Sequence, residues 1–141
     1  MTTKAFKLDS QLKNDCILIT ELDLCTVLLM NENQFPWVIL VPRRSNTTEI
    51  CQLNDQEQTQ LQKESNLIST TLLREHPGSK LNIANLGNIV SQLHVHHIAR
   101  FDDDTAWPAP VWGNFTPSPY STTEIDQKIA LWRNWISEKP N

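Results

Sequence analysis

The sequence predicts a domain that combines strands with two long amphipathic helices, and three patterns lead to this expectation. Two apolar runs, 25–30 and 35–42, flank a polar tetrapeptide, which is typical of a β-hairpin. Apolar residues recur at helical spacing over 55–75. Segments 81–86 and 93–98 alternate polar with apolar residues, as two neighbouring strands do, and Gly87-Asn88 lies between them as a turn or bend.

The helix over 55–75 has clear start and stop signals. Asn54-Asp55 is a plausible amino-terminal cap, and His76-Pro77-Gly78 ends the helix. Leu61, Ile68 and Leu72 are spaced by seven and four residues and therefore lie on one apolar stripe.

The two ends of the chain also carry helical signals. Residues 8–19 predict a short helix followed by an extended apolar piece. Near the other end, Ser121 and Glu124 have the spacing of a capping box, and apolar residues at helical spacing follow to the end of the chain. The sequence therefore predicts an amphipathic carboxy-terminal helix.

The segment between the last predicted strand and this helix is unusual. Residues 101–119 contain three aspartates, four prolines and two tryptophans. This is too rich in proline for regular structure and too aromatic for an idle linker. We expect the segment to pack over another part of the protein.

Composition excludes several function classes. The chain has 141 residues, the usual length of one domain. No apolar run approaches the ~20 residues that a membrane span needs, so no membrane association is expected. The formal net charge is −4 and basic residues do not cluster beyond Arg43-Arg44, which argues against a DNA or RNA polymer as partner. Residues 1–7 have no secretory pattern, which predicts a cytoplasmic protein.

Three of the four histidines fall within Gln92-Leu93-His94-Val95-His96-His97-Ile98. On a strand, Gln92, His94 and His96 share one face, while His97 faces the other way and is expected beneath the helix. The shared face suits a metal site, which would need a further ligand from His76 or 102–104, or a nucleophilic imidazole with neighbouring donors. A polar sheet edge with exposed histidines is a third interpretation.

These residues and their context resemble the histidine triad (HIT) superfamily, whose signature is His-φ-His-φ-His-φ-φ, with φ apolar. The segment 92–98 is a Gln-φ-His-φ-His variant of this triad. Residues 35–44 resemble the family's upstream Pro-x-His strand, with Trp37 in place of the histidine. Residues 82–88 resemble the Asn-rich stretch before the triad.

The resemblance implies one α+β domain of HIT-like fold over residues 1–141, with a HIT core at about 8–101 and the Trp/Pro-rich segment and carboxy-terminal helix in 102–141. The family fold is an antiparallel sheet of about five strands with a long helix across one face. Family members usually pair as homodimers, so a homodimer is expected here.

The resemblance also implies a nucleotide-binding hydrolase or nucleotidyl transferase that cleaves a nucleoside phosphoryl bond, in a dinucleoside polyphosphate or a nucleoside phosphoramidate. His94 takes the place of the nucleophile that forms a nucleotidyl-histidine intermediate. His96 is a donor to the phosphoryl oxygens, and Gln92 can donate a hydrogen bond but cannot take part in proton transfer. No cofactor is required, although a divalent cation can accompany the substrate phosphates.

Five further positions are predicted to contact the substrate. Asn31 falls where the family holds the ribose hydroxyls, and Asn82 and Asn88 fall near phosphate contacts. Arg100 is predicted to neutralise a phosphate, with an ion pair to 102–104 as the alternative. Trp112, within the segment 107–113, offers a stacking face that could cap the nucleotide pocket of this chain or of a partner.

Gln92 and Trp37 replace two histidines of the family pattern, which leaves two alternatives to the hydrolase. One is a nucleotide-binding module with weak or no turnover. The other is a metal-dependent hydrolase with His94 and His96 as ligands.

Overall fold

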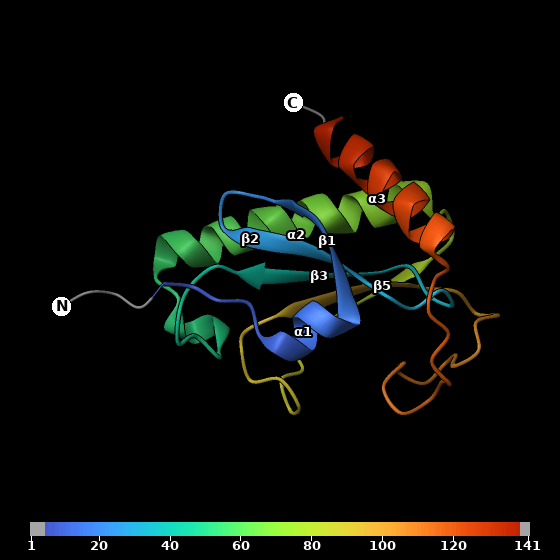
Figure 1. Ribbon diagram of the computed structural model, residues 1–141, viewed down its shortest axis with the longest axis horizontal. Coiled ribbons are helices and arrows are strands. Elements are labelled where there is room, and N and C mark those ends of the chain that lie inside the picture. Colours follow the sequence, from blue (N-terminus) through green and yellow to red (C-terminus); the bar gives the residue numbers. More distant parts are fainter. Residues whose placement is uncertain (1–4, 139–141) are drawn as a thin grey trace.

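A computed structural model describes residues 5–138 of the chain and contains one five-stranded antiparallel sheet (Figure 1). The strand order across the sheet is β1-β2-β3-β5-β4. The strands are β1 (Cys16–Glu21), β2 (Cys25–Met30), β3 (Trp37–Pro42), β4 (Lys80–Ala84) and β5 (Val95–Arg100). The helices are α1 (Ser10–Asp15), α2 (Asp55–Glu75) and α3 (Thr122–Ser137), and a short 3-10 helix, η1, spans Ile50–Gln52. The α+β HIT-like fold is therefore confirmed.

The central strands β2, β3 and β5 are buried on both faces, and each face of the sheet has its own hydrophobic cluster. α2 and α3 cover one face, where Leu61, Ile68 and Trp132 pack against alternate residues of the central strands. The other face is covered by α1 and by irregular chain that contributes Ala106 and Val111. Strands with both faces buried are apolar throughout, which explains why residues 25–30 and 37–42 show little alternation.

The long helix α2 begins and ends where the sequence predicts. Asn54 accepts a hydrogen bond from the backbone N–H of Glu57, and the Glu57 side chain accepts one from the backbone of Asn54, which completes a capping box. The helix ends at Glu75, directly before His76. The capping box predicted at Ser121 and Glu124 is also present, and α3 starts there.

A buried carboxylate on α2 ties the helix to the turn between β1 and β2. Glu64 is only 4% exposed, and its two oxygens accept hydrogen bonds from the backbone N–H groups of Leu24 and Cys25, at 2.9 and 2.8 Å. Gln60 donates a further bond at 2.7 Å. The side chain therefore satisfies two backbone donors that the turn leaves without a partner in the sheet.

The triad segment differs from its sequence-based expectation. The strands expected over 81–86 and 93–98 are β4, which ends at Ala84, and β5, which begins at Val95. His94 therefore lies with Gln92 in a loop, 85–94, and not in a strand. The reason is that this part of the chain bonds to other segments: the Leu93 N–H, for example, donates to the Thr47 carbonyl at 2.9 Å. β4 and β5 are nevertheless antiparallel neighbours, as predicted.

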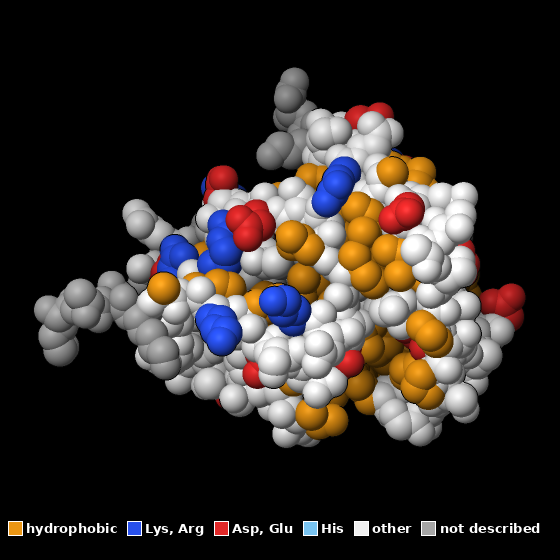
Figure 2. Space-filling model, in the orientation of Figure 1, with side chains coloured by type: hydrophobic (Ala, Val, Ile, Leu, Met, Phe, Trp, Pro, Cys, Tyr) orange, Lys and Arg blue, Asp and Glu red, His pale blue; other side chains and the backbone are white. Residues whose placement is uncertain are grey.

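The Trp/Pro-rich segment is irregular and packs over the sheet, as expected. It is fastened to the turn between β2 and β3 by Glu32, whose side chain is 1% exposed and accepts the Ser118 N–H at 2.7 Å. The Asn33 N–H in turn donates to the Ser118 carbonyl at 2.8 Å. Hydrophobic side chains reach the surface along this segment and beside α3 (Figure 2).

Two sequence-based expectations concern the ends of the chain and its relation to membranes. Residues 1–4 and 139–141 lie outside the described residues, and with them part of the segment on which the absence of a secretory signal was predicted. Between residues 5 and 138, no helix has both the length and the apolar character that crossing a bilayer requires.

Glu64→Ala tests the link between α2 and the turn. We expect a loss of about 3 kcal/mol in the free energy of unfolding, because two buried backbone N–H groups lose their acceptor. Urea denaturation measures the change. Gln62→Ala is the control on an exposed position of the same helix and should change the value by less than about 0.5 kcal/mol. Equal effects of the two substitutions would contradict this account of Glu64.

Candidate functional site

The alternation of β5 separates the histidines. Val95 and Ala99 belong to the hydrophobic cluster beneath α2, whereas Ile98 belongs to the cluster on the opposite face. His96 lies on the side of Ile98, next to His94, and the centroids of the two imidazoles are 4.9 Å apart with their planes at 73°. Both are buried, at 3% exposure for His94 and 6% for His96. The predicted pairing of the two imidazoles is therefore present.

The His94 ring is oriented by the backbone of the loop that carries it. Its Nδ1 lies 2.7 Å from the carbonyl oxygen of Gln92. Because a carbonyl oxygen can only accept, Nδ1 carries the proton and the neutral ring keeps its lone pair on Nε2. This is the tautomer that a nucleophilic imidazole needs.

The His96 ring is held by a different partner and has the opposite tautomer. The indole Nε1–H of Trp37 donates to Nδ1 of His96 at 3.0 Å. Burial is the main cause that lowers the pKa of His96 to about 3. Electrostatic interaction with His94 and His97 lowers it further, and a backbone hydrogen bond with Leu86 opposes this shift. His96 is therefore neutral near pH 7 and carries its proton on Nε2.

His97 points to the other face of the sheet, beneath α2, as predicted. Its Nε2 lies 2.8 Å from the hydroxyl of Ser65, and its Nδ1 lies 3.1 Å from the Val95 carbonyl. Burial lowers the pKa of His97 to about 4. These contacts give His97 a packing role, apart from the pair formed by His94 and His96.

Gln92 lies beside the histidines, but both ends of its side-chain amide are occupied. Oε1 accepts the Asp9 N–H at 2.9 Å, and Nε2 donates to the Lys7 carbonyl at 2.8 Å. The side chain thus pairs with the extended backbone before α1. The same residue therefore holds the amino-terminal segment with its side chain and orients His94 with its carbonyl.

Arg100 forms an ion pair, which is the alternative that the sequence left open for it. Its side chain is 1% exposed and donates to both carboxylate oxygens of Asp104, at 2.6 and 2.9 Å, and to the Asn82 side-chain oxygen at 3.1 Å. The guanidinium also lies over the rings of Phe35 and Trp107. The structure thus brings Asn82 and Arg100 into contact with each other. That either residue contacts a substrate stays a prediction.

Of the remaining residues predicted to bind substrate, one packs against the paired imidazoles of His94 and His96 and two have other surroundings. The Trp112 ring packs against His96, with centroids 5.0 Å apart. Asn31 accepts the Tyr120 N–H at 2.9 Å and so helps to hold the chain before α3. Asn88 is exposed in the loop 85–94. The segment 107–113 therefore covers the histidines of its own chain.

Sequence reasoning missed the bond from Trp37 and the position of the amino-terminal segment. In the family pattern, Trp37 stands only for the loss of a histidine. One signal was available: the indole N–H of a tryptophan in a buried strand needs an acceptor, and His96 lies on the neighbouring strand β5. No comparable signal connects residues 7–9 with Gln92.

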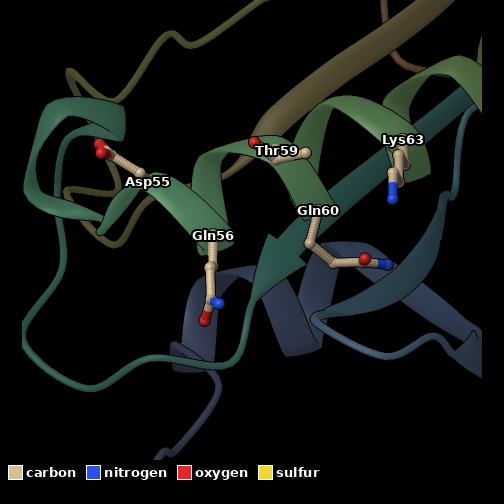
Figure 3. Close-up of a pocket in the computed structure, with 5 residues that line it drawn as sticks. All are labelled: Asp55, Gln56, Thr59, Gln60 and Lys63. Carbon is tan, nitrogen blue, oxygen red and sulfur yellow. The ribbon is translucent and has the colours of Figure 1, made fainter.

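A pocket on α2 lies apart from the histidines and does not compete with this site. The pocket in Figure 3 has a volume of about 310 Å³ and is lined by five side chains of α2: Asp55, Gln56, Thr59, Gln60 and Lys63. It contains no histidine, and its lining is the polar start of the helix. Over residues 5–138, no group of three or more His, Cys, Asp or Glu side chains could hold a metal ion.

Taken together, the open antiparallel sheet, the helix across it and the paired imidazoles at the start of β5 define the histidine triad class of proteins. The chain belongs to the HIT domain family, whose model matches residues 11–103. Comparison with curated proteins gave no match.

Solved structures of histidine triad proteins are similar over nearly the whole chain. One from Bradyrhizobium japonicum is 44% identical, covers 94% of this chain and 99% of its own, and has a TM-score of 0.90. One from Marinobacter aquaeolei VT8 is 42% identical, with coverages of 96% and 98% and a TM-score of 0.92. Diadenosine triphosphate hydrolase of Plasmodium falciparum shares the fold at 14% identity, with coverages of 99% and 88% and a TM-score of 0.58.

The ion pair between Arg100 and Asp104 predicts a pH dependence of stability. The hydrogen bonds from Arg100 lower the pKa of Asp104 from 3.8 to about 2. Because the pKa is lower in the folded state, this stabilisation is complete above pH 4 and is lost as the pH falls towards 2. We expect the difference in free energy of unfolding between wild type and Asp104→Asn to shrink by about 2 kcal/mol over this range.

Urea denaturation at several pH values between 6 and 2 measures this difference. Asp103→Asn, at the exposed neighbouring carboxylate, is the control and should follow the wild-type profile. Parallel profiles for wild type and Asp104→Asn would show that the ion pair does not contribute in this way.

Proposed function

We propose that this protein is a hydrolase that cleaves a nucleoside phosphoryl bond through a covalent nucleotidyl intermediate on His94. The observation that carries the proposal is the hydrogen bond from Nδ1 of His94 to the Gln92 carbonyl, which leaves the Nε2 lone pair free. Membership of the HIT domain family supports the same chemistry. At the level of the fold, likeness to a diadenosine triphosphate hydrolase also supports it.

The reaction takes place in two displacements. Nε2 of His94 attacks phosphorus, an N–P bond forms, and the bond to the leaving group breaks with its electron pair on that group. Water then attacks phosphorus, the electron pair of the N–P bond returns to Nε2, and the proton of water passes to solvent. His96 donates from Nε2–H to a phosphoryl oxygen and stabilises the charge that develops there.

The neutral state of His96 bears on the choice of substrate. Neither Gln92 nor Trp37 can supply a proton to the leaving group, and a pKa of about 3 means that His96 is not a general acid at pH 7. A nucleoside phosphate leaves as an anion without needing a proton, whereas an amine does need one. We therefore favour a dinucleoside polyphosphate over a nucleoside phosphoramidate.

The other predicted positions complete the proposed site. Asn31 would hold the ribose, Asn88 and Asn82 the phosphates, and Trp112 would stack on the base. Arg100 would act on the phosphates by holding Asn82. We propose that no cofactor is required, that a divalent cation accompanies the substrate phosphates, and that the protein acts in the cytoplasm.

A second candidate function is a nucleotide-binding module without turnover. It is favoured by the hydrogen bonds between the Gln92 amide and the backbone of residues 7–9, which occupy Oε1 and one of the two N–H groups and hold the side chain against the amino-terminal segment. It also agrees with the low exposure of His94, because the covering segments must move before a nucleotide reaches Nε2.

His94→Ala separates the two candidates. Wild type mixed briefly with diadenosine tetraphosphate should gain the mass of one adenylyl group in intact-protein mass spectrometry under acid-sparing conditions. The variant should form no adduct and lose more than about 10⁴-fold in turnover, because it lacks the covalent nucleophile. An adenosine phosphoramidate serves as the second substrate and should react more slowly.

His76→Ala is the matched control, since His76 lies at the end of α2 and should leave adduct formation unchanged. If wild type forms neither adduct nor product but still binds nucleotide by calorimetry, the hydrolase is refuted for these substrates and the binding module is favoured. If wild type forms no adduct on His94 and loses its activity when metal ions are chelated, the metal-dependent alternative is favoured.

We also propose that two copies of the chain pair through the free edge of β4. In the part of the chain that the structure describes, β4 bonds to β5 alone, so one edge of the strand presents unpaired backbone groups. Ile83 on this strand is 51% exposed, and Ile89 in the following loop is 94% exposed. An open strand edge beside exposed apolar side chains favours pairing with an identical edge.

Ile83→Lys tests this pairing. Light scattering coupled to size-exclusion chromatography should give a dimer mass for wild type and a monomer mass for the variant, because a buried lysine charge opposes pairing. Leu131→Lys, at a 43% exposed position of α3, is the control and should stay dimeric. A monomeric wild type at micromolar concentration would disprove the proposal.

A further inference from the structure

Trp37 is held rigidly against His96. Its side chain is 2% exposed on β3, in the cluster that lies on the face opposite α2. The edges of Trp112 and Phe115 pack against its ring, each with a centroid distance of 6.0 Å. A ring enclosed in this way cannot turn its N–H to another acceptor without disturbing the cluster.

The direction of the hydrogen bond between Trp37 and His96 has only one solution. An indole nitrogen is a donor and never an acceptor, so the Nδ1 of His96 that faces it, at 3.0 Å, must be the acceptor. The single ring proton of neutral His96 is then on Nε2. A protonated ring would set one N–H against another.

The other groups around His96 agree with this assignment. The Leu86 backbone is a hydrogen-bond partner of the ring, and with Nδ1 occupied by Trp37 the nitrogen left to donate to its carbonyl is Nε2. The titratable groups that act on the ring are His94 and His97, and positive charge on either one favours the neutral form of His96. Trp37, His94 and His97 therefore favour a neutral ring. The Leu86 contact opposes the lowering of the pKa but agrees with a proton on Nε2.

We propose that Trp37 is a positioning residue that fixes His96 as a permanently neutral Nε2–H donor for the phosphoryl group attacked by His94. The inference rests on the proposed function for its catalytic consequence. It changes the meaning of the departure from the family pattern, because the tryptophan orients a triad imidazole. Unlike a histidine at this position, the indole cannot exchange a proton with the site.

The two imidazoles then have complementary states. His94 presents a lone pair at Nε2 and His96 presents a proton at Nε2, because their Nδ1 atoms face a carbonyl acceptor and an indole donor, respectively. When a nucleotide binds, the Nε2–H of His96 exchanges the Leu86 carbonyl for a phosphoryl oxygen. The proton stays on His96 throughout the reaction.

The test compares Trp37→Phe with wild type by ¹⁵N NMR of the histidine rings, without nucleotide and with AMP. In wild type, the His96 nitrogens should show a single Nε2–H tautomer that does not titrate between pH 5 and 8, and the Nε2 signal should shift when AMP binds. In the variant, the Nδ1 signal should move towards that of an unbonded nitrogen, because the donor has been removed and the ring packing largely kept. kcat should fall about two- to tenfold, with a smaller change in KM.

Phe115→Leu is the matched control. It removes an aromatic ring from the same cluster, next to Trp37, but keeps the indole donor. It should lower stability without changing the tautomer of His96. Three results would overturn the inference: an Nδ1–H tautomer in wild type, ring signals that Trp37→Phe leaves unchanged, or AMP binding without a shift at Nε2. A wild type that lacks turnover would refute the proposed hydrolase, while the nucleotide-free spectra would still decide the role of Trp37.

Discussion

The arrangement of this protein depends on the burial of the central strands of its sheet on both faces. β2, β3 and β5 are central strands, so side chains on either face of the sheet must be covered. α2 and α3 supply a regular cover for one face. The other face is covered by α1 and by irregular chain from residues 101–115, and it is on this face that His94 and His96 lie. The position of the site beneath irregular segments thus follows from how the chain completes its core.

Burial also sets the chemistry of the histidines. Removing an imidazole from water disfavours its charged form, and this is the main reason why the pKa values of His96 and His97 are lowered, to about 3 and about 4. Hydrogen bonds then choose the tautomer of each neutral ring. The same element, β5, thereby presents a structural histidine to α2 and a donor histidine to the candidate site.

Two substitutions that look like losses in the sequence have definite partners in the structure. Gln92 uses an amide, which can accept and donate at once, to pair with the backbone of Lys7 and Asp9. Trp37 uses an indole, which can only donate, to orient His96. The family pattern could not predict either hydrogen-bond partner, because both Gln92 and Trp37 replace a histidine of that pattern.

The amino-acid sequence was sufficient to predict the types of the main secondary-structure elements and the bounds of β2 and α2, because periodicity and capping are properties of neighbouring residues. It predicted α2 over 55–75, the hairpin of β2 and β3, the capping box at Ser121 and the turning of His97 towards α2. Only the tertiary structure decided that Gln92 and His94 precede β5, that Arg100 is paired with Asp104, and that Trp37 donates to His96. These outcomes depend on which segments, far apart in the chain, meet with a matching donor and acceptor, and no local pattern contains that information.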